Sequence, residues 1–143
     1  MAGLRGVGGT LVLDADGLSK LAAKDRRAQI FFEAARAHRS RVITAASTLT
    51  EVLRGGPKDA AVHRWLKLIA VVPLDKEFGR AAGELLGRTG LSGHRCALDA
   101  LLAVVALAQP RPVVLLTSDP RDLEKLTYEP ERPRVERVAV VTV

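Results

Sequence analysis

The sequence predicts an α/β protein, a three-layer α/β/α sandwich around a mainly parallel sheet. Short apolar runs rich in Val, Ile and Leu alternate with longer segments of helical periodicity along the chain. The run at residues 113–116 is continuously apolar, which is typical of a parallel strand covered on both faces. The chain has 143 residues, a length that suits one domain of this kind and leaves no room for a second.

Five apolar runs are expected to form the strands. They lie at residues 11–13, 41–44, 69–72, 113–116 and 138–143. Most are rich in β-branched side chains, which favour extended backbone. Pro73 closes the third run, because proline has no amide to donate to a sheet.

Helices are expected between these strands. Helical patterns cover residues 16–23, 26–39, 46–54, a segment ending near 68, and then 75–88, 93–108 and 119–126. Residues 1–10 contain four glycines and are expected to form a flexible lead-in. The single folded domain is then predicted over residues 11–143.

Composition and charge narrow the functional classes. Hydrophobic residues make up 48% and charged residues 27% of the chain, which is globular composition rather than that of a disordered tail. No apolar run approaches the roughly 18 residues that span a bilayer, so no membrane association is predicted. The single cysteine, Cys96, excludes an internal disulfide and a Cys-built metal site, and it fits a cytoplasmic location.

The balance of charge favours an anionic partner. Lys and Arg number 22 against 16 Asp and Glu, a formal net charge of +6, and neutralising phosphates releases counterions. Aromatic residues are 3% of the chain, which argues against recognition dominated by base stacking.

Several acidic residues have local structural explanations. Asp14 follows the first strand as a turn residue, and Asp16 is the expected cap of the next helix. Glu51 completes a capping-box pattern that begins at Thr48, and it also stands three residues before Arg54. Asp119 and Asp122 fit the start of a helix, since Pro120 suits the first helical position.

Asp99 is more informative because it interrupts a helix that is apolar all round. An uncompensated carboxylate in a protein core costs several kcal/mol, as a rough figure. Arg95, one turn earlier, is one possible partner, and a metal ion is the other. We favour the metal because of where the other carboxylates lie.

The joint placement of these acids suggests a metal site. Asp14 and Asp119 follow two strands, Glu51 begins a helix after a third, and Asp99 lies early in a core helix. Ligands bind at the carboxyl ends of parallel strands, where such residues can meet, and crowded carboxylates need protons or a cation. Oxygen ligands without convergent His or Cys favour Mg²⁺ or Mn²⁺, ions that assist phosphodiester hydrolysis.

Other chemistry-bearing residues carry less weight. The three histidines have no metal-ligand spacing, and no Ser-His-Asp arrangement or nucleophile elbow is present. Cys96 is expected to be a small buried apolar residue. Candidate phosphate contacts are basic residues on solvated faces, namely Lys20, Lys24, Arg26, Arg27 and Arg54.

The order of these pieces resembles the PIN-domain ribonucleases, in particular the VapC-like toxins of type II toxin–antitoxin systems. The resemblance runs from residue 11 to the C-terminus. It is carried by LVLD at 11–14, LTEV at 49–52, LLGRTG at 85–90 leading to LDALLA at 98–103, and LTSDPRDL at 116–123.

The resemblance implies a PIN-like fold and a metal-dependent endoribonuclease. Asp14, Glu51, Asp99 and Asp119 would bind Mg²⁺ or Mn²⁺ as the catalytic acids, with Thr117 as a supporting polar residue and Asp122 as a candidate fifth carboxylate. RNA phosphodiester bonds would be hydrolysed to leave a 5′-phosphate and a 3′-hydroxyl. The implied partners are an RNA substrate, a small cognate antitoxin whose tail fills the acidic groove, and a second copy of the chain in a homodimer.

Two other functions fit parts of the sequence. A catalytically silent PIN fold would bind RNA or a protein without cutting. A receiver-type signalling domain also gathers acids at strand ends, but it requires an Asp after its middle strand and a Lys after a late strand. Here Pro73 and Thr117 follow the corresponding runs, so this interpretation ranks last.

Overall fold

The computed structural model describes residues 8–143, and residues 1–7 lie outside the described part. Within it, one five-stranded sheet has the order β3-β2-β1-β4-β5, and all four strand pairings are parallel. The strands are β1 (Thr10–Leu13), β2 (Arg41–Ala45), β3 (Ala70–Val72), β4 (Val113–Thr117) and β5 (Ala139–Thr142). The predicted strands are confirmed, with ends that differ by at most one residue.

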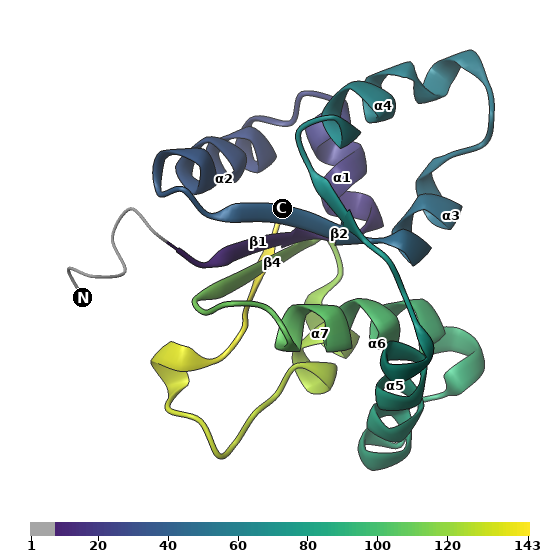
Figure 1. The fold of residues 1–143 in the computed structure, drawn as a ribbon, viewed down its shortest axis with the longest axis vertical. Coiled ribbons are helices and arrows are strands. Elements are labelled where there is room, and N and C mark those ends of the chain that lie inside the picture. The colour runs from purple at the N-terminus through teal and green to yellow at the C-terminus, as the bar shows by residue number, and fades with distance from the viewer. Residues whose placement is uncertain (1–7) are drawn as a thin grey trace.

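Helices cover both faces of the sheet, which confirms the predicted three-layer fold (Figure 1). One face carries α1 (Ala15–Ala22), α2 (Arg26–Ala37) and α4 (Ala60–Leu66). The other carries α5 (Lys76–Thr89), α6 (Gly93–Leu107) and α7 (Pro120–Leu126). The short α3 (Leu49–Val52) follows β2 at the side of the sheet. Among the described helices, none combines the length and the apolarity needed to cross a bilayer.

Two expected helices are shorter and more broken than their sequence patterns indicate. The segment expected at 46–54 divides into a 3-10 turn, Ala46–Thr48, and α3. A second 3-10 turn, Pro57–Asp59, precedes α4. The buried carboxylate of Asp59 accepts hydrogen bonds from the amides of Arg54 and Gly55 at 2.9 and 2.7 Å, and this holds the intervening loop in place.

The predicted lead-in over residues 1–10 falls mainly on residues outside the described part. Its last residues belong to the fold, since Thr10 begins β1 and is buried. The Ser40 hydroxyl donates to the carbonyl of Gly8 at 2.7 Å, which ties this stretch to the start of β2.

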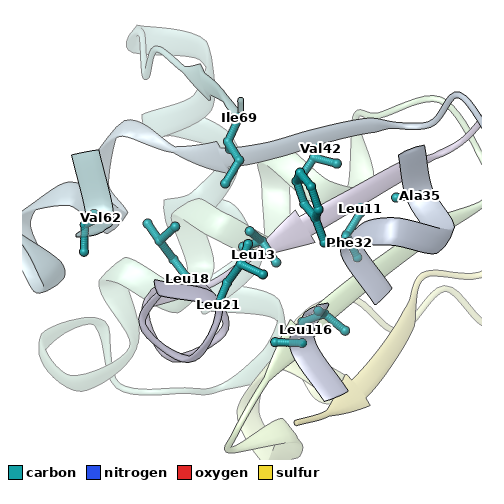
Figure 2. Packing of buried hydrophobic residues seen from close by; sticks show 11 residues of the cluster. Leu11, Leu13, Leu18, Leu21, Phe32, Ala35, Val42, Val62, Ile69 and Leu116 are labelled. Carbon is teal, nitrogen blue, oxygen red and sulfur yellow. The ribbon is translucent and has the colours of Figure 1, made fainter. Parts of the chain in front are cut away.

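The central strand β1 supplies side chains to both faces of the sheet, because successive residues of a strand point to opposite sides. Leu11 and Leu13 pack with Leu18 and Leu21 of α1 and with Phe32 of α2, as Figure 2 shows. All five side chains are buried, so this cluster fixes the start of α1 next to the end of β1.

The opposite face is held by a second cluster. Val12 of β1 and Leu115 of β4 pack with Val105 of α6 and Leu123 of α7. These four side chains are buried, and a third cluster joins α5 to α6 through residues such as Leu85 and Ala103. Helices α6 and α7 are thus anchored close to the ends of β1 and β4.

Gly17 allows α1 to approach β4 closely. A Cβ atom at this position would lie 2.9 Å from the backbone carbonyl oxygen of Leu116, closer than real Cβ contacts allow. The backbone of β4 cannot easily move, because it is paired with β1 and β5. Glycine at position 17 therefore sets the distance between the first turn of α1 and the end of β4.

We expect Gly17→Ala to lower the free energy of unfolding by about 1–3 kcal/mol, because overpacking outweighs the helix propensity of alanine. Gly83→Ala is the matched control. Gly83 lies inside α5 with open space where a Cβ atom would lie, and this change should stabilise by about 0.5–1 kcal/mol. Urea unfolding of both variants measures the difference, and equal effects of the two substitutions would contradict the prediction.

Candidate active site

A pocket of about 190 Å³ opens at the carboxyl ends of β1 and β4. Its wall brings together residues from distant parts of the sequence, and all six predicted site residues are among them. The lining side chains are Asp14, Ala15, Asp16, Thr48, Glu51, Leu98, Asp99, Leu102, Thr117, Asp119 and Asp122. Six of these residues carry carboxylates, and no basic residue of the described chain lines the pocket.

Asp14 is positioned by the end of β1 and by the first turn of α1. Its backbone amide donates to the carbonyl of Leu116 in β4 at 3.2 Å. Its side-chain oxygen accepts a hydrogen bond from the amide of Gly17 at 2.7 Å, so Asp14 is the N-cap of α1. The expectation that Asp16 caps this helix is wrong, because the helix begins at Ala15 and leaves Asp16 in its first turn.

Asp16 is a pocket residue that the sequence interpretation missed. Its exposed carboxylate accepts a hydrogen bond from the hydroxyl of Ser118, which follows β4. The sequence feature that could have identified it is its position two residues after Asp14. Either aspartate makes a good cap, and only the observed start of the helix separates their roles.

Asp119 and Thr117 lie where β4 runs into α7. The Thr117 hydroxyl is buried and accepts a hydrogen bond from the Asp119 amide at 3.1 Å. Asp119 occupies the N-cap position of α7, as predicted, but its side chain makes no capping hydrogen bond. Instead, its Oδ1 atom accepts a hydrogen bond from Nε of Arg121 at 3.3 Å in an exposed ion pair.

The local explanations for Glu51 and Asp99 do not hold in the described chain. No ion pair joins Asp99 to Arg95 or Glu51 to Arg54 among residues 8–143. Helix α3 has no side-chain cap, so Glu51 does not complete a capping box, and Arg54 donates instead to backbone carbonyls. Asp99 is half-buried and lines the pocket, so it is less enclosed than an all-apolar helix suggests.

Asp122 lies in the first turn of α7, facing α6. Its Oδ2 atom is 3.6 Å from the Sγ atom of Cys96, which can donate a weak hydrogen bond to it. Cys96 is buried, as expected for a small apolar residue, and burial raises the pKa of its thiol. This contact orients the Asp122 carboxylate at the pocket wall.

Crowding and burial change the acidity of the pocket carboxylates. Burial, opposed by hydrogen bonds from Thr117 and Gly17, raises the pKa of Asp14 to about 6. Burial followed by repulsion from neighbouring carboxylates also raises the pKa of Glu51 and of Asp99. The hydrogen bond from Arg121 instead lowers the pKa of Asp119.

The chemistry of this donor set fits a hard divalent cation. Its carboxylates are the ligands that Mg²⁺ and Mn²⁺ prefer, and a bound cation would relieve their mutual repulsion. Within residues 8–143, however, no three His, Cys, Asp or Glu side chains are arranged to hold one ion between them. Mg²⁺ keeps several of its waters and is commonly bound through one or two carboxylates, so three direct protein ligands are not required.

Comparison with solved structures identifies the fold. The chain is similar to a chain of the VapBC2 complex from Rickettsia felis bound to a DNA fragment from its promoter, with a TM-score of 0.66, 15% identity, and coverage of 94% of this chain and 98% of that chain. It is also similar to a chain of the DNA-bound VapBC complex from Salmonella typhimurium, with a TM-score of 0.64, 18% identity, and coverage of 93% and 97%.

No protein-family model and no curated protein sequence matches the chain. At these identities the structural likeness establishes the fold alone. The predicted fold is therefore confirmed, and this chain has the PIN-like α/β/α architecture found in VapBC complexes.

The raised pKa of Asp14 predicts how stability depends on pH. The pKa is about 6 in the folded chain against 3.8 as the ordinary value, so folding favours the protonated form. The associated stability is fully present below pH 3.8 and is lost as the pH rises through about 6. Asp14→Asn removes the charge and keeps an acceptor for the Gly17 amide. In metal-free buffer it should therefore stabilise the chain at pH 7.5 by about 1–3 kcal/mol and have little effect at pH 4.

Thermal melts at the two pH values measure this difference. Asp75→Asn is the matched control, because Asp75 caps α5 through a hydrogen bond from the amide of Phe78 and lies outside the acidic pocket. The control should leave the melting temperature nearly unchanged at both pH values. If Asp14→Asn instead destabilises the chain equally at pH 7.5 and pH 4, burial and repulsion of the Asp14 charge do not lower the stability of the folded chain.

Proposed function

We propose that this chain is a divalent-metal-dependent endoribonuclease and the toxin of a toxin–antitoxin pair. The observation that carries the proposal is the gathering of six carboxylates, from four separate segments, in one pocket that no basic side chain of the described residues lines. Such a concentration of negative charge suits a site for a divalent cation. The net charge of +6 on the whole chain suits a polyanionic substrate.

In the proposed reaction, water attacks the phosphorus atom while the bond to the 3′ oxygen breaks, leaving a 5′-phosphate and a 3′-hydroxyl. Asp14, Glu51, Asp99 and Asp119 are the proposed ligands of Mg²⁺ or Mn²⁺, with Asp16 and Asp122 beside them. When bound, the cation would activate the water and stabilise charge on the phosphate. The proton of the water would pass to solvent or to a pocket carboxylate that does not bind the cation, and solvent would supply the proton that the leaving 3′ oxygen takes up.

The side chains around Asp14 prepare it for this role. The Gly17 amide holds one of its oxygens, and buried Thr117 lines the pocket next to it, so the carboxylate has one preferred orientation. The supporting residues lie on β1, β4 and the first turn of α1, which pack into the core. A site held by packed elements keeps its geometry without the ligand.

The proposed protein partner is a small antitoxin with a basic segment. The two similar solved structures are VapBC complexes, which is the reason to expect a partner of this type here. An acidic pocket without its own basic lining would attract an arginine or lysine from such a segment. The homodimer predicted from the sequence is part of the same proposal.

A catalytically silent binding module is the second candidate. It is favoured by the absence, among residues 8–143, of three acidic or histidine side chains arranged to hold an ion. Such a module would bind RNA or a protein and leave the RNA uncut. A cleavage assay separates the two functions.

Asp14→Asn and Asp99→Asn should each reduce Mn²⁺-dependent cleavage of RNA by at least about 100-fold, because each removes a charged ligand that positions the cation. The Asp75→Asn control should cleave at the wild-type rate, since Asp75 lies outside the pocket. Gel analysis of total RNA after incubation with each purified protein measures the effect. If the wild-type protein and both pocket variants degrade RNA equally, the nuclease proposal is wrong.

Mg²⁺ at millimolar concentration should raise the melting temperature of the wild-type chain by about 2–5 °C, because it binds the folded state alone. Asp99→Asn should lose most of this increase, whereas the Asp75→Asn control should retain it. NaCl at three times the concentration, which has the same ionic strength as the MgCl₂ solution, serves as the control. An equal increase in all three proteins would indicate general charge screening and no site.

A further inference from the structure

A second hollow lies beside the acidic pocket, along the outer side of α7. Its volume is about 510 Å³, and it is lined by Thr89, Arg121, Glu124, Lys125 and Tyr128. We propose that this hollow binds a single-stranded segment of the RNA next to the bond that is cut, with a base on Tyr128 and phosphate on Arg121 and Lys125. The inference rests on the proposed function for the identity of the ligand as RNA.

Tyr128 is the reason to expect base binding. The chain has five aromatic residues, and four of them pack in the hydrophobic clusters, namely Phe31, Phe32, Trp65 and Phe78. Tyr128 is 61% exposed and lines the hollow. Stacking of a base on an exposed aromatic ring is a common way to hold single-stranded nucleic acid.

The Tyr128 ring is held by Arg137, which does not line the hollow. The guanidinium carbon of Arg137 lies 5.1 Å from the ring centroid. Arg137 is itself fixed, since its Nε atom donates to the carbonyl of Arg132 at 2.9 Å. A ring supported in this way loses little freedom when a base stacks on it.

The cations of the hollow lie in a row along α7. Arg121 and Lys125 are four residues apart and therefore occupy the same face of the helix. Arg121 is 84% exposed in its side chain, and Lys125 is also exposed. Glu124 is the one acidic residue of the described lining, so the two cations leave a net positive charge for a phosphate.

Arg121 connects the hollow to the acidic pocket. It lines the hollow, and its Nε atom donates to Asp119, which lines the pocket. Its two terminal nitrogens make no hydrogen bond within residues 8–143, so they can donate to a phosphate while Nε stays on Asp119. Helix α7 ends at Leu126 and Tyr128 follows its C-cap, so a strand that leaves the pocket at Arg121 would reach the ring by following α7.

This arrangement selects unpaired RNA. A base in a duplex is stacked on its neighbours and has no face free for a tyrosine, whereas a loop or an end can turn a base outward. The hollow would therefore direct the acidic pocket to single-stranded segments. Phosphate contacts alone would not make this distinction.

The test measures binding in EDTA, so that no cleavage occurs, by fluorescence anisotropy of a short labelled single-stranded RNA of mixed sequence. Tyr128→Ala should weaken binding roughly 5- to 100-fold, and Tyr128→Phe, which keeps the ring, should bind like the wild type. Lys125→Ala should make the plot of log affinity against log salt concentration less steep, by about the amount that one phosphate contact contributes. Lys67→Ala removes the same charge from the end of α4 on the other side of the sheet and should leave both quantities unchanged.

A duplex RNA of the same length completes the design, because Tyr128→Ala should not alter its affinity. The proposal is overturned if the wild type does not bind the single strand, if Tyr128→Ala binds it as the wild type does, or if Tyr128→Phe is as weak as Tyr128→Ala. It is also overturned if Tyr128→Ala weakens binding to a protein partner and leaves binding to RNA unchanged. Cleavage is measured separately: RNA binding that depends on Tyr128 in a chain that cuts no RNA would refute the nuclease and leave this subsite standing.

Discussion

Repulsion among carboxylates at one end of a parallel sheet is opposed by the packing of the elements that carry them, and by hydrogen bonds to Asp14 and Asp119. Asp14 and Asp119 follow adjacent parallel strands, so neither can move away without breaking strand pairing. Buried residues on both faces of β1, such as Leu13 and Val12, fix the strand between two layers of helices. The hydrophobic core thus stabilises a site that is electrostatically unfavourable without cations. Burial of the Asp14 charge, followed by repulsion from Asp16 and Asp99, is why we expect loss of that charge to stabilise the chain.

The position of the pocket follows from the connections of the sheet. After β1 the chain turns to α1 on one face, and after β4 it turns to α7 on the other, although the two strands are neighbours (Figure 1). Connections that leave adjacent parallel strands in opposite directions open a crevice at the carboxyl ends, where ligands bind in such folds. Gly17 keeps α1 close to β4 at this point, so the crevice is narrow and its carboxylates are crowded.

The fold could be predicted because its determinants are local. An apolar run such as residues 113–116 can form little other than a buried strand. The order of strands and helices along the chain then leaves few possible topologies for the sheet. The gathering of Asp14, Glu51, Asp99 and Asp119 in one pocket also followed, because strand ends and the helices after them meet at one edge, whereas Asp122 was expected only from the family resemblance. The role of Asp16 did not follow, since two aspartates of equal capping ability stand two residues apart. Nor did the exposure of Tyr128, which depends on which helices cover it and not on its neighbours in sequence.

The distribution of charge reconciles an acidic site with the polyanionic substrate that we propose. When the six pocket carboxylates are set aside, 22 basic residues stand against the ten remaining acidic ones, so the rest of the chain is strongly positive. RNA would be attracted by that surface and repelled by the pocket itself until a cation is bound. Arg121 stands at the boundary, with one nitrogen on Asp119 and two without hydrogen bonds in the described chain. A phosphate bound by those two nitrogens would lie beside Asp119, which is why we propose that the RNA strand continues from the site into the hollow along α7.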